Sequence, residues 1–334
     1  MSDHSTAITP DDVAASLGRN DGGFGRNQQT YYEQPVVRAA PWGWEIVWYF
    51  YIGGIMAGSA MLSAFADETG RAEDAPLIRN GRYVALGGAL ASSVLLIKDL
   101  GRPERFLSML RIFKLKSPMS VGVYTLIAFS NFAALAAANQ LKRDGVLRID
   151  LAGFLPRSFR NVMLALSSSL MGSYTGVLVS ATAIPVWYVG RRHIPATFVC
   201  SAISTSCALN VLLLALFDGD AETIARLERL ETICAIAEAL LLVDFRRRSG
   251  DDGKPWFAGE NGRKLRSYTL IGGIVVPLML NAPSLLHRGR ATKRHRVRTV
   301  LAAALTLFGG YTLRDTIVEA GRISAADPRA VLRR

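Results

Sequence analysis

Histidine and cysteine, the residues that most often ligate transition metals and haem iron, are scarce in this sequence of 334 residues. Membrane proteins hold haem b through histidines on facing helices. The four histidines here lie in the N-terminal region, in loops or at the ends of apolar runs, at His4, His193, His287 and His295. The sequence therefore argues against a protein that carries haem.

The three cysteines also lack the spacing of a metal site. Cys200, Cys207 and Cys234 all fall inside apolar runs, where cysteine behaves as a small apolar residue. A Walker-type phosphate loop and a Ser-His-Asp arrangement are equally missing from the sequence. We therefore expect no metal in this protein and packing roles for the cysteines.

What the sequence has instead is long apolar runs. Hydrophobic residues make up 50% of the chain, and a run of about 18 or more apolar residues can cross a membrane as a helix. The sequence predicts an all-α integral membrane protein with eight transmembrane helices. The runs lie at residues 44–66, 78–97, 119–141, 160–184, 194–217, 223–245, 267–286 and 298–320.

Little of the chain is left for a separate soluble domain. Residues 1–40 are polar and contain no apolar core of the signal-peptide type. We expect one membrane domain preceded by a polar N-terminal tail. In the first run, Gly54 and Gly58 are four residues apart, which predicts a close contact with another helix.

The formal net charge of +12 would suggest nucleic-acid binding in a soluble protein. Here the lysines and arginines crowd into the loops between the runs, which fits lipid head groups, docking partners and the positive-inside rule. We expect no nucleic-acid partner. With eight spans both termini lie on one side, called face A below, which carries more Lys and Arg than the opposite face B. This excess favours face A as cytoplasmic, but a basic loop is equally suited to docking a partner.

The polar stretch 98–106 (Lys-Asp-Leu-Gly-Arg-Pro-Glu-Arg-Phe) follows the second run at face A. Gly101 and Pro103 end the helix there, because proline cannot continue the backbone hydrogen bonding and restricts the residue before it. The stretch is either a solvated loop between two membrane helices or the rim of a site, with Asp99 and Arg102 at its mouth.

Ionisable side chains inside a span are costly and usually face a cavity or the interior of a helix bundle. Each such residue here also has a structural explanation, such as an interfacial aromatic ring, an acid at a helix N-terminus or a charge pair. Taken singly, only Asp99, Tyr174 and Arg314 favour a functional role. Together, however, six polar residues from five runs fall in the half of the membrane near face A: Glu45, Tyr49, Asp99, Tyr174, Glu238 and Arg314.

The half of the membrane near face B carries Asp218, Glu231 and Asn281. Glu231 and Glu238 are seven residues apart and share one face of their helix. The pair is either part of a proton relay or two solvated residues in an internal cavity.

Several segments of the sequence resemble the NrfD-type, or polysulfide-reductase-type, membrane subunits. The resemblance covers roughly residues 31–321, and its most specific part is Asp-Leu-Gly-Arg-Pro-Glu-Arg-Phe at 99–106 with Ser-Pro-Met-Ser-Val-Gly downstream. The segments are, in order along the sequence, 42–58, 99–106, 117–122, 174–178 and 309–314.

The resemblance implies two four-helix bundles, 41–190 and 191–321, followed by a C-terminal tail at 322–334. It implies a quinone pocket in the first bundle, near the face that docks an iron–sulfur subunit, and no haem. By position, Tyr174 matches the tyrosine that hydrogen-bonds the quinone, and Asp99 matches an acid at the pocket rim.

The expected function is therefore that of a membrane anchor and quinone-binding subunit of a respiratory oxidoreductase complex in the bacterial cytoplasmic (inner) membrane. Electrons would pass between a ferredoxin-like subunit with [4Fe-4S] clusters and menaquinone or ubiquinone. A molybdopterin or other catalytic subunit would complete the complex.

Tyr174, together with Tyr49, would hold a quinone carbonyl, and Arg102 would lie at the rim. Tyr49 stands where some family members have histidine, and tyrosine can still donate one hydrogen bond. Position 46 is isoleucine where some members have asparagine, so no donor is available there. Trp44 and Trp48 would flank the ring or pack in the core.

Glu45 or Asp99 would exchange the proton that accompanies each electron, since a buried anion is costly. Two other functions remain open. The protein could translocate protons in an energy-converting complex along Arg314, Glu238 and Glu231, or it could be a structural anchor without its own redox site.

Overall fold

Helices make up nearly all of the regular backbone. The computed structural model of the chain describes residues 40, 42–101, 111, 113–114, 116–149, 153, 155–217, 219–286 and 293–327. No strand occurs among these residues, which confirms the all-α fold. They belong to one compact unit, Val36–Arg334. The predicted N-terminal tail lies outside the described residues, apart from Ala40.

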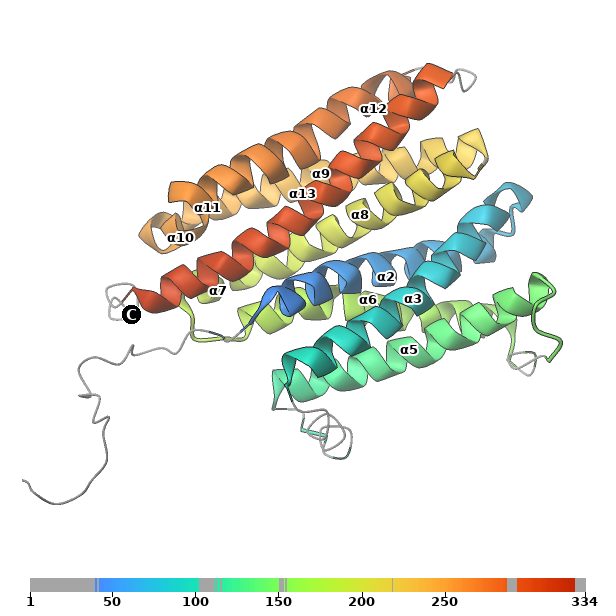
Figure 1. Cartoon of the computed structure of the whole chain (residues 1–334), viewed down its shortest axis with the longest axis horizontal. Helices are drawn as coiled ribbons and strands as arrows, with labels where there is room; N and C mark the ends of the chain where they lie inside the picture. The colour runs from blue at the N-terminus through green and yellow to red at the C-terminus, as the bar shows by residue number, and fades with distance from the viewer. Residues whose placement is uncertain are drawn as a thin grey trace, which may run out of the picture. The chain divides into compact units, whose positions relative to one another are not determined.

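Four long helices at the start of the described region pack in a ring (Figure 1). They are α2 (Trp44–Thr69), α3 (Ala75–Asp99), α5 (Pro118–Arg143) and α6 (Arg157–Ser180). α2 packs against α3 and α6, and α5 closes the ring by packing against the same two helices. A single 3-10 turn, Ala72–Asp74, lies between α2 and α3.

Local sequence fixes where these helices begin and end. α2 ends at Gly70, whose φ of 69° is a left-handed conformation that favours glycine. α5 begins after Ser117, whose side chain accepts a hydrogen bond from the Ser120 backbone N–H at 3.4 Å, and Pro118 occupies the first turn. α3 ends just before Gly101, as the sequence predicts.

The rest of the protein forms a second group of helices, linked to the first through α7 (Pro185–Val189). In this group α8 packs against α9 and α13, and the segment η5–α12 packs against the same two helices. α8 also packs against α2 and α6, so that it joins the two groups (Figure 1). The remaining bounds are η3 Gly190–Arg192, α8 Ile194–Leu216, α9 Ala221–Ser249, η4 Gly250–Gly253, α10 Lys254–Phe257, α11 Gly259–Lys264, the π-helix η5 Leu265–Val275, α12 Val276–Leu286 and α13 Lys293–Ala326.

Among the described residues, five helices are long and apolar enough to cross a membrane: α2, α5, α6, α8 and the segment Gly259–Ala282. The predicted runs 78–97, 223–245 and 298–320 also lie in helices, α3, α9 and α13, but charged residues lower the hydropathy of these three. The structure thus supports a membrane protein with several apolar helices. The count of eight spans and the division into bundles at residues 190 and 191 stay predictions.

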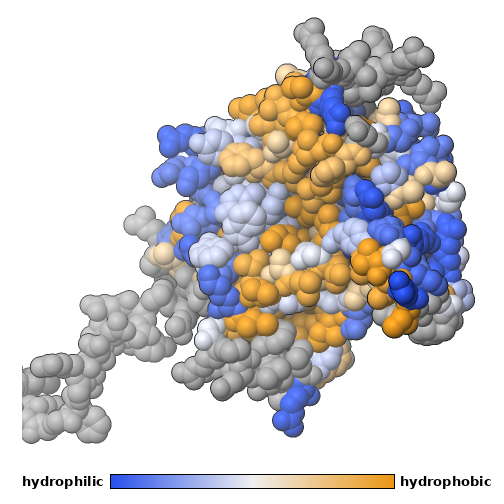
Figure 2. Space-filling view, turned by 45° about the vertical axis from the view of Figure 1, so that its right-hand side comes forward, coloured by the Kyte–Doolittle hydropathy of each residue, from blue (hydrophilic) through white to orange (hydrophobic). Residues whose placement is uncertain are grey.

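Large apolar side chains are exposed along the outer faces of the helices. Figure 2 shows a broad apolar surface with polar residues on either side of it. Soluble monomers rarely expose apolar patches of this kind, whereas lipid tails suit them. Side chains that are more than half exposed include Leu90, Val94, Leu166, Leu170, Ile233 and Leu240.

Gly54 and Gly58 of α2 face α8, which confirms the close helix contact that their spacing predicts. A Cβ at position 54 would lie 3.1 Å from the Cβ of Ala202, and a Cβ at position 58 would overlap Ser206. The Ser206 hydroxyl donates a hydrogen bond to the Ile55 carbonyl of α2 at 3.0 Å. Glycine at 54 and 58 therefore lets the two helix backbones approach closely.

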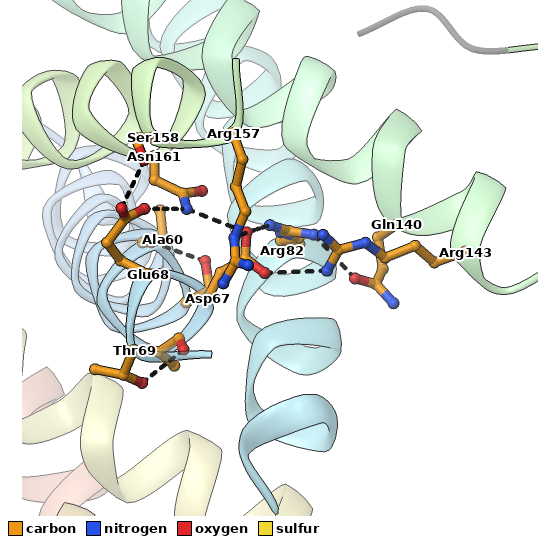
Figure 3. Close-up of polar contacts among 12 residues, drawn as sticks. Ala60, Asp67, Glu68, Thr69, Arg82, Gln140, Arg143, Arg157, Ser158 and Asn161 are labelled. Carbon is orange, nitrogen blue, oxygen red and sulfur yellow. Dashed lines mark hydrogen bonds and ion pairs between the residues drawn. The ribbon is translucent and has the colours of Figure 1, made fainter. Parts of the chain in front are cut away.

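One buried carboxylate ties together the face B ends of the first four helices (Figure 3). Asp67 of α2 is 3% exposed and accepts a hydrogen bond from Arg82 of α3 at 2.8 Å. Arg143 of α5 lies 3.1 Å from the same carboxylate, and Arg157 and Asn161 of α6 reach it at 3.5 and 3.1 Å. The Arg82 side chain is 2% exposed, so its charge depends on Asp67 for compensation.

We expect Asp67→Asn to destabilise the protein by about 3 to 5 kcal/mol, because it leaves the buried Arg82 without a counter-charge. Thermal unfolding in detergent measures this loss. Glu260→Gln is the matched control, since it breaks the exposed ion pair with Lys264 (3.5 Å) and such pairs contribute little. Equal melting temperatures for the two variants would contradict the role assigned to Asp67.

Candidate functional site

A narrow pocket opens between the face A ends of α2, α3, α5 and α6, at the opposite end from Asp67. Most of the residues that line it are aliphatic or aromatic. Three of the lining side chains can donate a hydrogen bond, namely the phenols of Tyr49 and Tyr174 and the indole of Trp42. The lining residues are Trp42, Ile46, Tyr49, Leu96, Leu100, Met119, Gly122, Val123, Tyr174 and Leu178.

The pocket brings together Tyr49 and Tyr174, which the sequence places at similar depth on two different helices. Tyr49 is 3% exposed and Tyr174 is 8% exposed. The Tyr174 hydroxyl donates a hydrogen bond to the Pro118 carbonyl at 2.5 Å. Its phenol lies directly on Gly122, because a Cβ at that position would overlap the hydroxyl.

The first turn of α5 therefore determines where the Tyr174 hydroxyl points. The Ser117 cap and Pro118 fix the start of the helix, and Gly122 comes one turn later on the same face. The cavity holds only ≈ 30 Å³, room for about one or two water molecules. A ring-sized ligand therefore enters only if lining residues such as Met119, which is 45% exposed, change conformation.

Charged residues gather at the rim, beside the N-terminus of α2. The Lys98 ammonium lies 3.6 Å from a Glu45 carboxylate oxygen and 4.2 Å from the centre of the Trp44 ring. Asp99 lies just beyond the apolar run of α3, where burial and the neighbouring Glu45 carboxylate raise the pKa of its carboxyl. Arg102 lies outside the described residues.

The tryptophans expected to flank a ring do not line the pocket. Trp44 is 55% exposed with the Lys98 ammonium over its ring, and Trp48 is 38% exposed and contacts Tyr311 at 4.8 Å between ring centres. Trp42 lines the pocket instead. Helical spacing gave no signal for it in the sequence, because Trp42 lies before the first residue of α2.

The residues of the predicted proton path lie in the second group of helices. Arg314 is 1% exposed, and its guanidinium donates hydrogen bonds to the Ser201 hydroxyl at 2.5 Å and to the Gly310 carbonyl at 2.9 Å. The buried Glu238 lies close enough to Ser201 and Arg314 for both to act on its carboxylate. The structure thus brings Arg314 and Glu238 together.

Glu231 lies on the same face of α9 and accepts a hydrogen bond from Thr306 at 2.7 Å. One turn earlier, the buried Glu228 accepts one from Thr299 at 3.0 Å. Glu228 was not among the residues predicted from the sequence, although its spacing of three from Glu231 was a signal for the shared face. Three buried carboxylates therefore follow one side of α9.

Asn281 and two of the cysteines lie in the interior of the described part of the protein. Asn281 is buried, and Asp218 lies outside the described residues. Cys207 and Cys234 are buried free thiols, which fits packing roles. In the described part of the protein, no group of three or more His, Cys, Asp or Glu side chains is arranged to hold a metal ion.

The one histidine whose side chain the structure describes is placed as the sequence suggests. The His193 ring lies at a helix junction, with Nε2 2.8 Å from an Asp244 carboxylate oxygen. His4 and His287 lie outside the described residues, as does the side chain of His295.

Comparison with known proteins places nearly all of the described region in one family. The family model "Polysulphide reductase, NrfD" matches residues 34–326. Protein NrfD of Escherichia coli (strain K12) is 27% identical over 316 residues, which cover 85% of this sequence and 96% of that protein. The C subunit of the polysulfide reductase of Wolinella succinogenes is 27% identical over 305 residues, covering 84% and 94%. An NrfD homolog of Haemophilus influenzae is 24% identical over 320 residues, covering 85% and 95%. The protein, a membrane protein with several apolar helices, therefore belongs to the NrfD polysulphide reductase family.

Proposed function

We propose that the protein is the quinone-binding membrane subunit of a respiratory oxidoreductase complex. It exchanges electrons between an iron–sulfur subunit docked at face A and menaquinone or ubiquinone in the bacterial cytoplasmic membrane. The observation that carries the proposal is the pocket itself, in which Tyr49 and Tyr174 reach one apolar space built from four helices.

The lining fits a quinone head group in chemistry. A quinone has a flat apolar ring with carbonyl oxygens that accept hydrogen bonds, and a site of this kind needs an apolar wall with a few placed donors. Tyr174 already donates to a carbonyl, that of Pro118. A ligand carbonyl would replace Pro118 as the acceptor when the pocket opens. When bound, the quinone supplies two-electron redox chemistry.

The rim suits proton exchange with that pocket. Reduction of a quinone takes up one proton for each electron, and a nearby carboxyl with a raised pKa can hold such a proton. Asp99 meets this condition, and Glu45 lies beside it at the start of α2. We assign the proton-exchanging role to one of these two side chains.

The relatives support a proposal about the partners. One relative is named as a single component of a polysulfide reductase, so that protein works as one part of a larger enzyme. We propose the same here, with a ferredoxin-like [4Fe-4S] subunit as the neighbour and a molybdopterin or other catalytic subunit beyond it. We expect no haem or metal within the membrane subunit itself.

A second candidate function is proton translocation through the second group of helices. The observation that favours it is the row of buried acids on α9, with Glu231 hydrogen-bonded to Thr306 and Glu238 close to the buried Arg314. Turnover of the assembled complex in liposomes separates the two functions. Protons that cross the membrane beyond those released by the quinone favour translocation, and Glu238→Gln would then remove only this excess.

We expect Tyr174→Phe to weaken binding of the quinone analogue 2-heptyl-4-hydroxyquinoline N-oxide about two- to tenfold, because one net hydrogen bond is worth about 0.5 to 1.5 kcal/mol. The measurement is a fluorescence titration of the purified protein, and of the assembled complex if the isolated protein shows no saturation. Absence of saturable binding to both preparations would leave a structural anchor and overturn the proposal.

Gly122→Ala tests whether the pocket depends on the position of the Tyr174 ring. The added methyl group would occupy the space of the Tyr174 hydroxyl, so we expect the ring to be pushed into the pocket and analogue binding to fall at least about tenfold. Gly172→Ala on α6 is the control, since its Cβ would make only an ordinary contact, 3.6 Å from Ala57. Equal affinity in both variants would argue against this pocket.

A further inference from the structure

We propose that Trp42 is the residue that contacts the ligand ring, and that α13 holds Trp42 in place through Trp187 and Arg322. This inference rests on the proposed function, because it names the residues that shape the same pocket. It assigns a role to residues of the second group of helices at a pocket built by the first group.

Among the aromatic residues that line the pocket, Trp42 is the one that lies outside a helix. It lies one residue before the N-cap of α2, Gly43, which has no side chain to make a capping hydrogen bond. Its ring orientation therefore depends on tertiary contacts. The ring is stacked on Trp187, with 5.0 Å between ring centres and 23° between ring planes, and meets Phe50 edge-on at 5.6 Å.

Trp187 is in turn held by α13. It is 0% exposed, and its indole N–H donates a hydrogen bond to the Ile317 carbonyl at 2.8 Å. The backbone N–H of Val186 donates a hydrogen bond to the Ser324 hydroxyl at 3.2 Å, which also fixes the short helix α7 on α13. The Trp187 ring packs directly against Gly321, and a Cβ at position 321 would overlap the ring.

The backbone of Trp42 is also tied to α13. The Arg322 guanidinium donates a hydrogen bond to the Trp42 carbonyl. The same guanidinium forms an ion pair with Glu319, one turn earlier in α13, at 3.3 Å. Residues 317–324 of α13 therefore hold Trp42 by two routes, through its carbonyl and through the ring on which it stacks. Trp187 and Arg322 are positioning residues, since neither lines the pocket.

The position of Trp42 suits recognition of a flat ring. The other two tryptophans near α2 lie outside the lining, so Trp42 supplies the large aromatic surface on this side of the pocket. Aromatic pairs gain energy beyond the area that they bury, and they do so only in a restricted set of relative orientations. A wall residue whose orientation is fixed from two sides therefore gives more affinity than one that must be ordered by the ligand.

The test is a double-mutant cycle measured by titration with 2-heptyl-4-hydroxyquinoline N-oxide on the same preparation that binds it in the wild type. We expect Trp42→Leu to weaken binding about two- to tenfold and Trp42→Phe to keep most of it. Gly321→Ala, which displaces Trp187, should weaken binding to a similar extent. In the Trp42→Leu background, Gly321→Ala should have no further effect, because it acts only through Trp42.

Gly87→Ala is the matched control, since a Cβ at that position meets nothing within 4 Å, and it should bind as the wild type does. If Gly321→Ala does not fold, Arg322→Gln replaces it in the cycle, as it removes only the bond to the Trp42 carbonyl and the pair with Glu319. Equal losses from the α13 substitution in both backgrounds would overturn the inference, as would full affinity of Trp42→Leu. Failure of the wild type to bind would instead overturn the proposed function.

Discussion

The close approach of α2 and α8 is the constraint on which the arrangement of the site depends. Glycine at 54 and 58 removes the side chains that would separate the two helices, and the Ser206 hydroxyl bonds to the backbone of α2. α2 can therefore present one face to each group of helices. Tyr49 points into the pocket of the first group, while the Tyr51 hydroxyl donates to the Leu307 carbonyl of the second at 3.0 Å. A bulky side chain at position 58 would push α2 and α8 apart.

The two ends of the first four helices are built on different physical principles. At face B, Asp67 contacts three arginines and an asparagine, and this end allows little movement because separating the buried pair of Asp67 and Arg82 would be costly. At face A, the same helices meet mainly through apolar side chains, with the hydrogen bond from Tyr174 to Pro118 and the ion pair between Lys98 and Glu45. Apolar contacts are non-directional and can rearrange around a ligand at small cost. The fixed end thus allows the other end to open without loss of the fold.

The sequence reveals those parts of this structure that depend on periodicity and depth. Apolar runs predict the helices, and the depth of Tyr49 and Tyr174 in their runs predicts that they share a level in the membrane. The sequence does not reveal which tryptophan lines the pocket. Trp42 lies before α2 and is oriented by α13, which is far along the sequence. Asp67 was missed for a similar reason. A carboxylate at the end of an apolar run is indistinguishable from a loop charge until its partners on three other helices are known.

Contacts between aromatic rings connect the pocket with the buried charges of the second group. Trp42 meets Phe50 at 5.6 Å, Phe50 meets Phe198 at 6.1 Å, and the Arg314 guanidinium lies 5.2 Å from the Phe198 ring. Coupling between two sites requires an element with two arrangements that both sites influence, and a series of contacts alone does not supply one. The pocket does supply a candidate, since it must open to admit a ring and Trp42 stands in its wall. A change in the packing of the Trp42 ring on Phe50 would reach Arg314 through two buried phenylalanines, Phe50 and Phe198. Redox chemistry in one half of the protein would then have a physical route to the carboxylates of the other.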